Sequence, residues 1–71
     1  MIKLIRHKSV PEIQREYGIP EDGTGQIIRE LLVAGAFGDD WTTVAGKRHK
    51  YEVGPDAEAR IAEAWRNGEI R

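Results

Sequence analysis

The sequence predicts a small α+β domain in which a strand, two helices, a β-hairpin and a final helix follow one another. Three observations carry this prediction. Two early segments repeat apolar residues at spacings of three and four, and glycine follows each of them. Two short β-prone segments then flank a loop that contains glycine. A last segment opens with a Gly-Pro pair and returns to the helical spacing.

The composition is that of one folded domain over residues 1–71. Hydrophobic residues make up 39% and charged residues 32% of the chain, which argues against disorder. The absence of cysteine excludes disulfides, thiolate metal sites and cysteine nucleophiles, and it fits a reducing cytoplasm. No apolar run is long enough for a signal-peptide core or a membrane span, so we expect a cytoplasmic protein.

The first part of the chain is expected to contain a strand and a short helix. Residues 2–5 are short and apolar, which is typical of a strand. Ser9 is placed to cap the helix that follows, with Pro11 in its first turn and Glu12 completing a capping box. Gly18 should end this helix, because glycine adopts the left-handed conformation at little cost.

A second helix is expected over residues 23–34, with Asp22 or Thr24 as its cap and Gly35 at its end. Two helices joined by a tight turn over residues 9–35 form a helix-turn-helix pattern. The apolar face of the second helix is wide and should enter the core through Ile27, Ile28, Leu31, Leu32 and Ala34.

The remainder of the chain is expected to form a hairpin and a helix. The hairpin spans residues 41–53 and carries a run of cations at its tip, over residues 47–50. The final helix spans residues 55–67 and should face the core through Ile61 and Trp65.

Residues 9–55 resemble the winged helix-turn-helix DNA-binding domains of bacterial transcription regulators of the IclR and MarR type. The resemblance lies in the Gly-Ile-Pro corner at 18–20 and in the Ile- and Leu-rich helix that ends in an Ala-Gly pair at 34–35. It also lies in the aromatic strand that leads into a Gly-Pro pair over 51–55, as in the wing of IclR-type regulators. The resemblance implies a winged helix that binds duplex DNA.

In such domains the second helix of the pair enters the major groove and its N-terminal residues face the bases. By position, the resemblance implies base-facing roles for Asp22, Gly25, Gln26 and Arg29. Glutamine can pair with adenine and arginine with guanine. The wing and the start of the first helix would contact phosphates through Lys47, Arg48, His49, Lys50, Arg6 and Lys8, with His7 beside them. This hypothesis requires an open polar side on the 23–34 helix and the basic loop beside it.

Several features depart from the family pattern. Phosphate would approach the turn at Glu21 and Asp22, whose negative charges repel it. The reading helix begins with Gly23 and Gly25, which offer no side chains for base contacts and lower its helix propensity. The helix that precedes the first strand in those proteins is missing, so we expect the C-terminal helix to cover that face of the core or to pair with a second copy. The formal net charge of −1 also counts against strong non-specific DNA binding.

The functional prediction is a double-stranded DNA-binding protein, a small transcription regulator or architectural factor that acts as a homodimer. The alternative is a protein-interaction module of the same fold, anchored on an exposed Trp41 or Phe37. A third option, single-stranded nucleic acid stacked on Trp41 and Tyr51, would need aromatics that the small core can hardly spare. We expect no enzyme activity, cofactor or metal site, because no phosphate loop, activated nucleophile or ligand spacing is present, and His7 and His49 are interpreted as surface residues.

Overall fold

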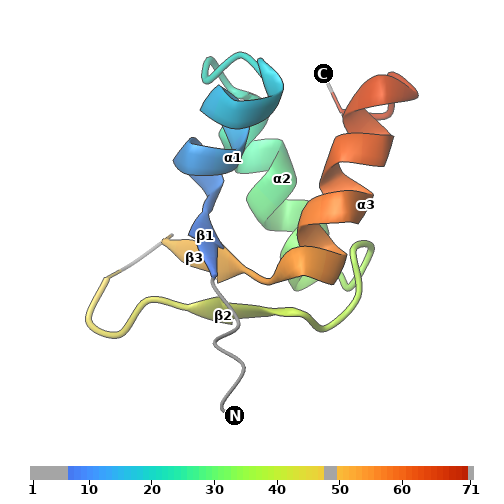
Figure 1. Ribbon diagram of the computed structural model, residues 1–71. Coiled ribbons are helices and arrows are strands. Elements are labelled where there is room, and N and C mark those ends of the chain that lie inside the picture. The colour runs from blue at the N-terminus through green and yellow to red at the C-terminus, as the bar shows by residue number, and fades with distance from the viewer. Residues whose placement is uncertain (1–6, 48–49, 71) are drawn as a thin grey trace, which may run out of the picture.

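Three helices and three strands make up the part of the chain that the computed structural model describes, residues 7–47 and 50–70 (Figure 1). The observed order is the predicted one, strand, helix, helix, hairpin and helix. The strand expected over residues 2–5 lies outside the described residues, and the first strand observed is a two-residue segment directly before the first helix. The elements are β1 (Lys8–Ser9), α1 (Val10–Tyr17), α2 (Thr24–Val33), β2 (Trp41–Thr43), β3 (Tyr51–Val53) and α3 (Pro55–Arg66).

The strands form one antiparallel sheet in the order β1-β3-β2. β3 is central, because Val53 is aligned with Lys8 on one side and with Trp41 on the other. The hairpin that joins β2 to β3 is closed further by a hydrogen bond of 3.0 Å from the Val44 N–H to the Lys50 carbonyl. β1 reaches the sheet from before the helix pair, so the sheet ties together segments that lie far apart in the sequence.

The start of α1 differs from the prediction, whereas its end agrees with it. Ser9 occupies the N-cap position, but its side chain makes no capping hydrogen bond, so the capping box predicted from Ser9 and Glu12 is not formed. Ser9 is held instead in extended conformation by its pairing with Glu52 of β3. Gly18 ends the helix at φ 70°, and its N–H donates to the carbonyl of Gln14, as expected of a left-handed C-cap.

The start of α2 also lacks the predicted side-chain cap. Gly23 occupies the N-cap position with φ 76°, and neither Asp22 nor Thr24 caps the helix. Thr24 is the first helical residue and is buried. Glycine is needed at position 23 because an L-residue is strained at this positive φ.

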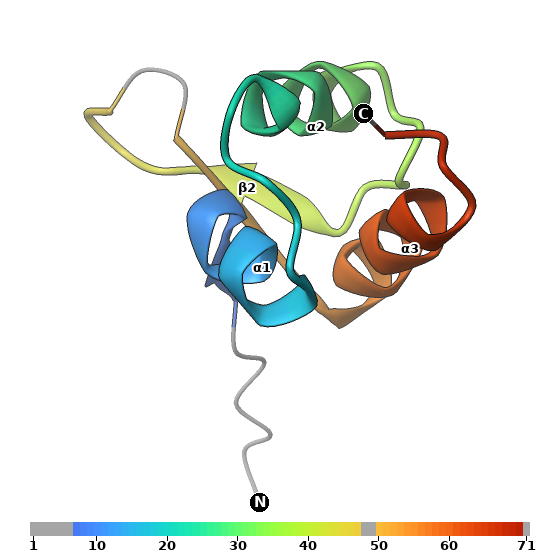
Figure 2. The same cartoon turned by 90° about the horizontal axis from the view of Figure 1, so that it is seen from above.

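The three helices lie on one side of the sheet and enclose the core between them (Figures 1 and 2). The predicted core position Ile61 is fully buried, and Trp65 is half-buried and packs against the core. Phe37 is buried, so the prediction that it could serve as an exposed anchor is wrong. The buried apolar residues are Val10, Ile13, Ile19, Ile28, Leu32, Phe37, Val53, Ala57, Ile61, Ala64 and Ile70.

Asp40 fixes the start of α3. Its backbone carbonyl accepts a hydrogen bond of 2.7 Å from the N–H of Gly54, and its carboxylate accepts one of 2.9 Å from the N–H of Asp56. Asp56 lies in the first turn of α3, where the helix leaves N–H groups without partners of its own. A side chain from before β2 therefore caps a helix that follows β3. None of the described helices is long and apolar enough to cross a bilayer.

Candidate nucleic-acid interface

The outward face of α2 is open to solvent. Gln26, Glu30 and Val33 are exposed and are spaced four and three residues apart, so they form one stripe along the helix. Val33 is 60% exposed, more than any other large hydrophobic residue in the described part of the chain. We call these three residues the α2 stripe. The condition that the polar side of this helix be uncovered is met within the described residues.

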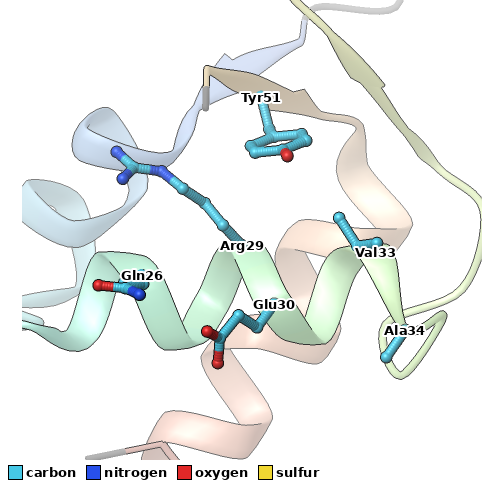
Figure 3. Close-up of a pocket in the computed structure, with 6 residues that line it drawn as sticks. All are labelled: Gln26, Arg29, Glu30, Val33, Ala34 and Tyr51. Carbon is cyan, nitrogen blue, oxygen red and sulfur yellow. The ribbon is translucent and has the colours of Figure 1, made fainter. Parts of the chain in front are cut away.

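The hairpin borders the same surface. Tyr51 of β3 lines a hollow of about 620 Å³ together with the outward side of α2 (Figure 3). Lys47 and Lys50 are exposed at the hairpin turn, while Arg48 and His49 lie outside the described residues. The hairpin turn extends away from α3 in both views (Figures 1 and 2). The hairpin that carries the basic turn therefore adjoins the open side of α2.

Arg29, one of the predicted base-facing residues, is only partly accessible. Its Nε is enclosed and has no hydrogen-bond partner among residues 7–47 and 50–70. Figure 3 shows its side chain leaving α2 toward the side of Tyr51, whereas the side chain of Glu30 leaves the helix in a different direction. The outermost positions of α2 are those of the α2 stripe.

Gly25 does not face outward, so the prediction that it contacts bases is wrong. It is buried against Gln14 of α1, and a Cβ at this position would lie 3.3 Å from the Gln14 Nε2. Gln14 is itself only 3% exposed and donates a hydrogen bond of 3.1 Å to the carbonyl of Pro20. Gly25 thus lets α2 approach α1 at the corner. Asp22, in the turn before α2, is exposed as expected.

Lys8 is held by two carboxylates rather than presented to a ligand. Its Nζ lies 2.7 Å from Glu16 of α1 and 3.1 Å from Glu58 of α3. The hydrogen bond to Glu16, followed by that to Glu58, raises the pKa of Lys8 above its ordinary value. Tyr17 donates a hydrogen bond of 2.5 Å to the same Glu58 carboxylate, and this bond raises the pKa of Tyr17. We remove Lys8 from the phosphate contacts; its predicted neighbour Arg6 lies outside the described residues.

Acidic residues gather on another part of the surface. The 38–40 turn and α3 border a hollow lined by Asp39, Asp40, Asp56 and Glu63, with Arg60 as the cation among them. This surface and the hairpin turn lie at opposite ends of the molecule in both views (Figures 1 and 2). Within residues 7–47 and 50–70, no group of three or more His, Asp or Glu side chains is arranged to hold a metal ion.

The base-facing residues predicted from the sequence did not include Glu30 or Val33, although both are exposed on the outward face of α2. The signal was present, because residues four and seven positions after Gln26 share its helix face. The choice of Gly25 and Arg29 followed the rule that the N-terminal part of a reading helix faces the bases. It did not account for the packing of α1 against the first turn of α2.

Comparison with known proteins finds no family model, no curated protein and no solved structure that matches this chain. The surface of the molecule is therefore the available guide to its function.

Proposed function

We propose that this chain is a winged helix-turn-helix domain that binds duplex DNA. In this proposal α2 enters the major groove and the turn of the β2–β3 hairpin lies against the neighbouring sugar-phosphate backbone. One observation carries it: the open side of α2 and Tyr51 of the hairpin border a common hollow, and the turn of that hairpin holds the exposed Lys47 and Lys50. A helix that can enter a groove and cations that can neutralise phosphate are thereby combined in neighbouring elements.

The topology supports the same proposal. A helix pair joined through a glycine corner is followed by a hairpin, and the short strand from before the helices pairs with the second strand of that hairpin. This is the arrangement expected of a winged helix. α3 covers the core through Ala57 and Ile61.

The charge distribution predicts weak binding by a single copy. The net charge of −1 leaves little general attraction to a polyanion, and the attraction is concentrated at residues 47–50. We expect non-specific dissociation constants in the range of about 10⁻⁴ to 10⁻⁶ M at physiological salt. Two copies on a two-fold site would double the contacts, so we propose that the protein acts as a homodimeric regulator.

The test is a titration of fluorescently labelled random-sequence duplex with the full chain, followed by anisotropy at several salt concentrations between about 50 and 200 mM. Replacing Lys47 and Lys50 with alanine should lower the slope of log K against log salt by about 1.8, because each phosphate contact contributes about 0.9. The matched control replaces Arg60 and Arg66 of α3, which removes the same charge from exposed positions elsewhere.

The control pair should leave the salt slope unchanged. Equal slopes for the Lys47/Lys50 variant and the wild type would remove the hairpin from the interface. If the wild type shows no binding even at about 50 mM salt, the lowest concentration of the series, DNA binding is refuted altogether.

A protein-interaction role is the second candidate, and the exposure of Val33 favours it. Val33, Ala34 and Tyr51 give the hollow an apolar side that a partner could fill. Trp41, the other anchor that the sequence suggests for this role, is half-buried and packs edge-on against Tyr51 with ring centroids 5.5 Å apart. That packing also disfavours a stacking platform for single-stranded nucleic acid. Loss of DNA binding in the titration above would leave the protein-partner role as the better explanation of the hollow.

A further inference from the structure

The middle of the α2 stripe is a carboxylate. Glu30 is exposed, and its side chain makes no hydrogen bond or ion pair with any other described residue. A negative charge at the centre of a surface that approaches DNA is repelled by phosphate. A hydrogen-bond donor on a base edge would offset this repulsion.

We propose that Glu30 determines specificity by selecting cytosine in the major groove; this inference rests on the proposed function. An ionised carboxylate can only accept hydrogen bonds. Guanine and thymine present acceptors at their major-groove edges, and adenine presents its amino group beside the N7 acceptor. Cytosine presents its N4 amino group with no acceptor next to it on the same base. It is therefore the base that meets a carboxylate with the least repulsion.

The neighbours of Glu30 on α2 fix the position of the selected cytosine relative to the other bases of the site. At 1.5 Å per residue, the seven positions from Gln26 to Val33 cover about 10 Å of helix, a length that can contact at most about three base-pair steps of 3.4 Å. Gln26 can form the paired hydrogen bonds that adenine offers, and Val33 can contact the methyl group of thymine. The α2 stripe then reads a short element in which cytosine lies between an adenine contact and a thymine contact, on either strand.

Glu30 also acts against the wrong sequences. Lys47 and Lys50 attract any duplex, whereas an unpaired carboxylate in the groove weakens binding to every site that lacks a suitably placed amino group. Specificity then comes as much from repulsion at other sites as from attraction at the right one.

The experiment is a selection from a randomised duplex library with the full-length wild type and with Glu30→Gln. The wild type should enrich sites with one position fixed as cytosine, preferred over the other bases by roughly 5- to 150-fold. Glutamine keeps the size of the side chain but adds a donor, so Glu30→Gln should change the preferred base at that position to adenine. It should also bind random duplex more tightly than the wild type does.

Glu63→Gln is the matched control, because Glu63 is an exposed carboxylate on α3 and its loss changes the net charge equally. This variant should keep the cytosine preference. The same change of base in both variants, or an enriched site that Glu30→Gln leaves unaltered, would overturn the role of Glu30 while DNA binding stands. A wild type that enriches no site and shows no salt-dependent retention of duplex would overturn the proposed function itself.

Discussion

The junction between β3 and α3 leaves no room for a side chain at residue 54. A Cβ on Gly54 would overlap the carboxylate of Asp40, the group that caps α3 through the Asp56 N–H. The backbone of Gly54 is extended, with φ −86° and ψ −177°, a conformation that alanine adopts as readily. The whole penalty of Gly54→Ala should therefore come from the contact with Asp40.

The size of the effect follows from these contacts. The added methyl group forces the Asp40 carboxylate away, which removes a helix cap worth about 0.5–2 kcal/mol and adds local overpacking. We expect Gly54→Ala to lower the free energy of unfolding by about 1–3 kcal/mol. Asp40→Ala alone should cost about 1 kcal/mol. In the Asp40→Ala background the clash is gone, and Gly54→Ala should be neutral or stabilising by up to about 1 kcal/mol, because alanine restricts the unfolded chain.

The assay is urea unfolding of the wild type, the two single variants and the double variant, followed by circular dichroism. The sign of the Gly54→Ala effect should change with the residue at position 40. Asp39→Ala provides the control background, since no hydrogen bond of the Asp39 side chain is observed within the described residues. An equal loss from Gly54→Ala in all three backgrounds would show that the Asp40 carboxylate is not the source of the penalty.

Two further predictions concern the side-chain contacts that join β1, α1 and α3, and a third concerns the α2 stripe. Lys8→Met should lower the urea midpoint at neutral pH, because Glu16 and Glu58 lose the cation between them. The folded-state pKa of Lys8 is raised, so the difference from wild type should disappear as the pH rises past that pKa, above about 10.4. Tyr17→Phe should likewise lower the urea midpoint below about pH 10 and have less effect above it, because the bond to Glu58 raises the pKa of the phenol and stabilises its neutral form. A difference between Tyr17→Phe and wild type that grows with pH would contradict this prediction. Replacing thymine with uracil in the enriched site should weaken the wild type by a few-fold and leave Val33→Ala unaffected, as measured by anisotropy.

The features predicted well from the sequence are set by the backbone preferences of single residues. Gly18 ends α1 in the left-handed conformation, and Pro55 opens α3, because these preferences act without help from the rest of the chain. The prediction failed where a distant partner decides the outcome. Ser9 was expected to cap α1 but pairs with Glu52, far along the chain, and the cap of α3 comes from Asp40 on the other side of the hairpin.

The candidate site shows the same division. The helical period places Gln26 on the outer face of α2, and Gln26 is exposed there. Gly25 was misplaced because nothing in its own segment reveals that Gln14 of α1 fills the space beside it. The enclosure of the Arg29 Nε is likewise a matter of packing, which no local pattern encodes.

The pairing of β1 with β3 has a consequence for how the molecule forms. Most of the described chain lies between Lys8 and Val53, yet these residues are aligned in the sheet. As the polypeptide leaves the ribosome, the helix pair emerges well before the strand that completes the sheet. β1 therefore cannot pair before β3 has been synthesised, so the sheet should form late, and its long-range pairing should slow folding.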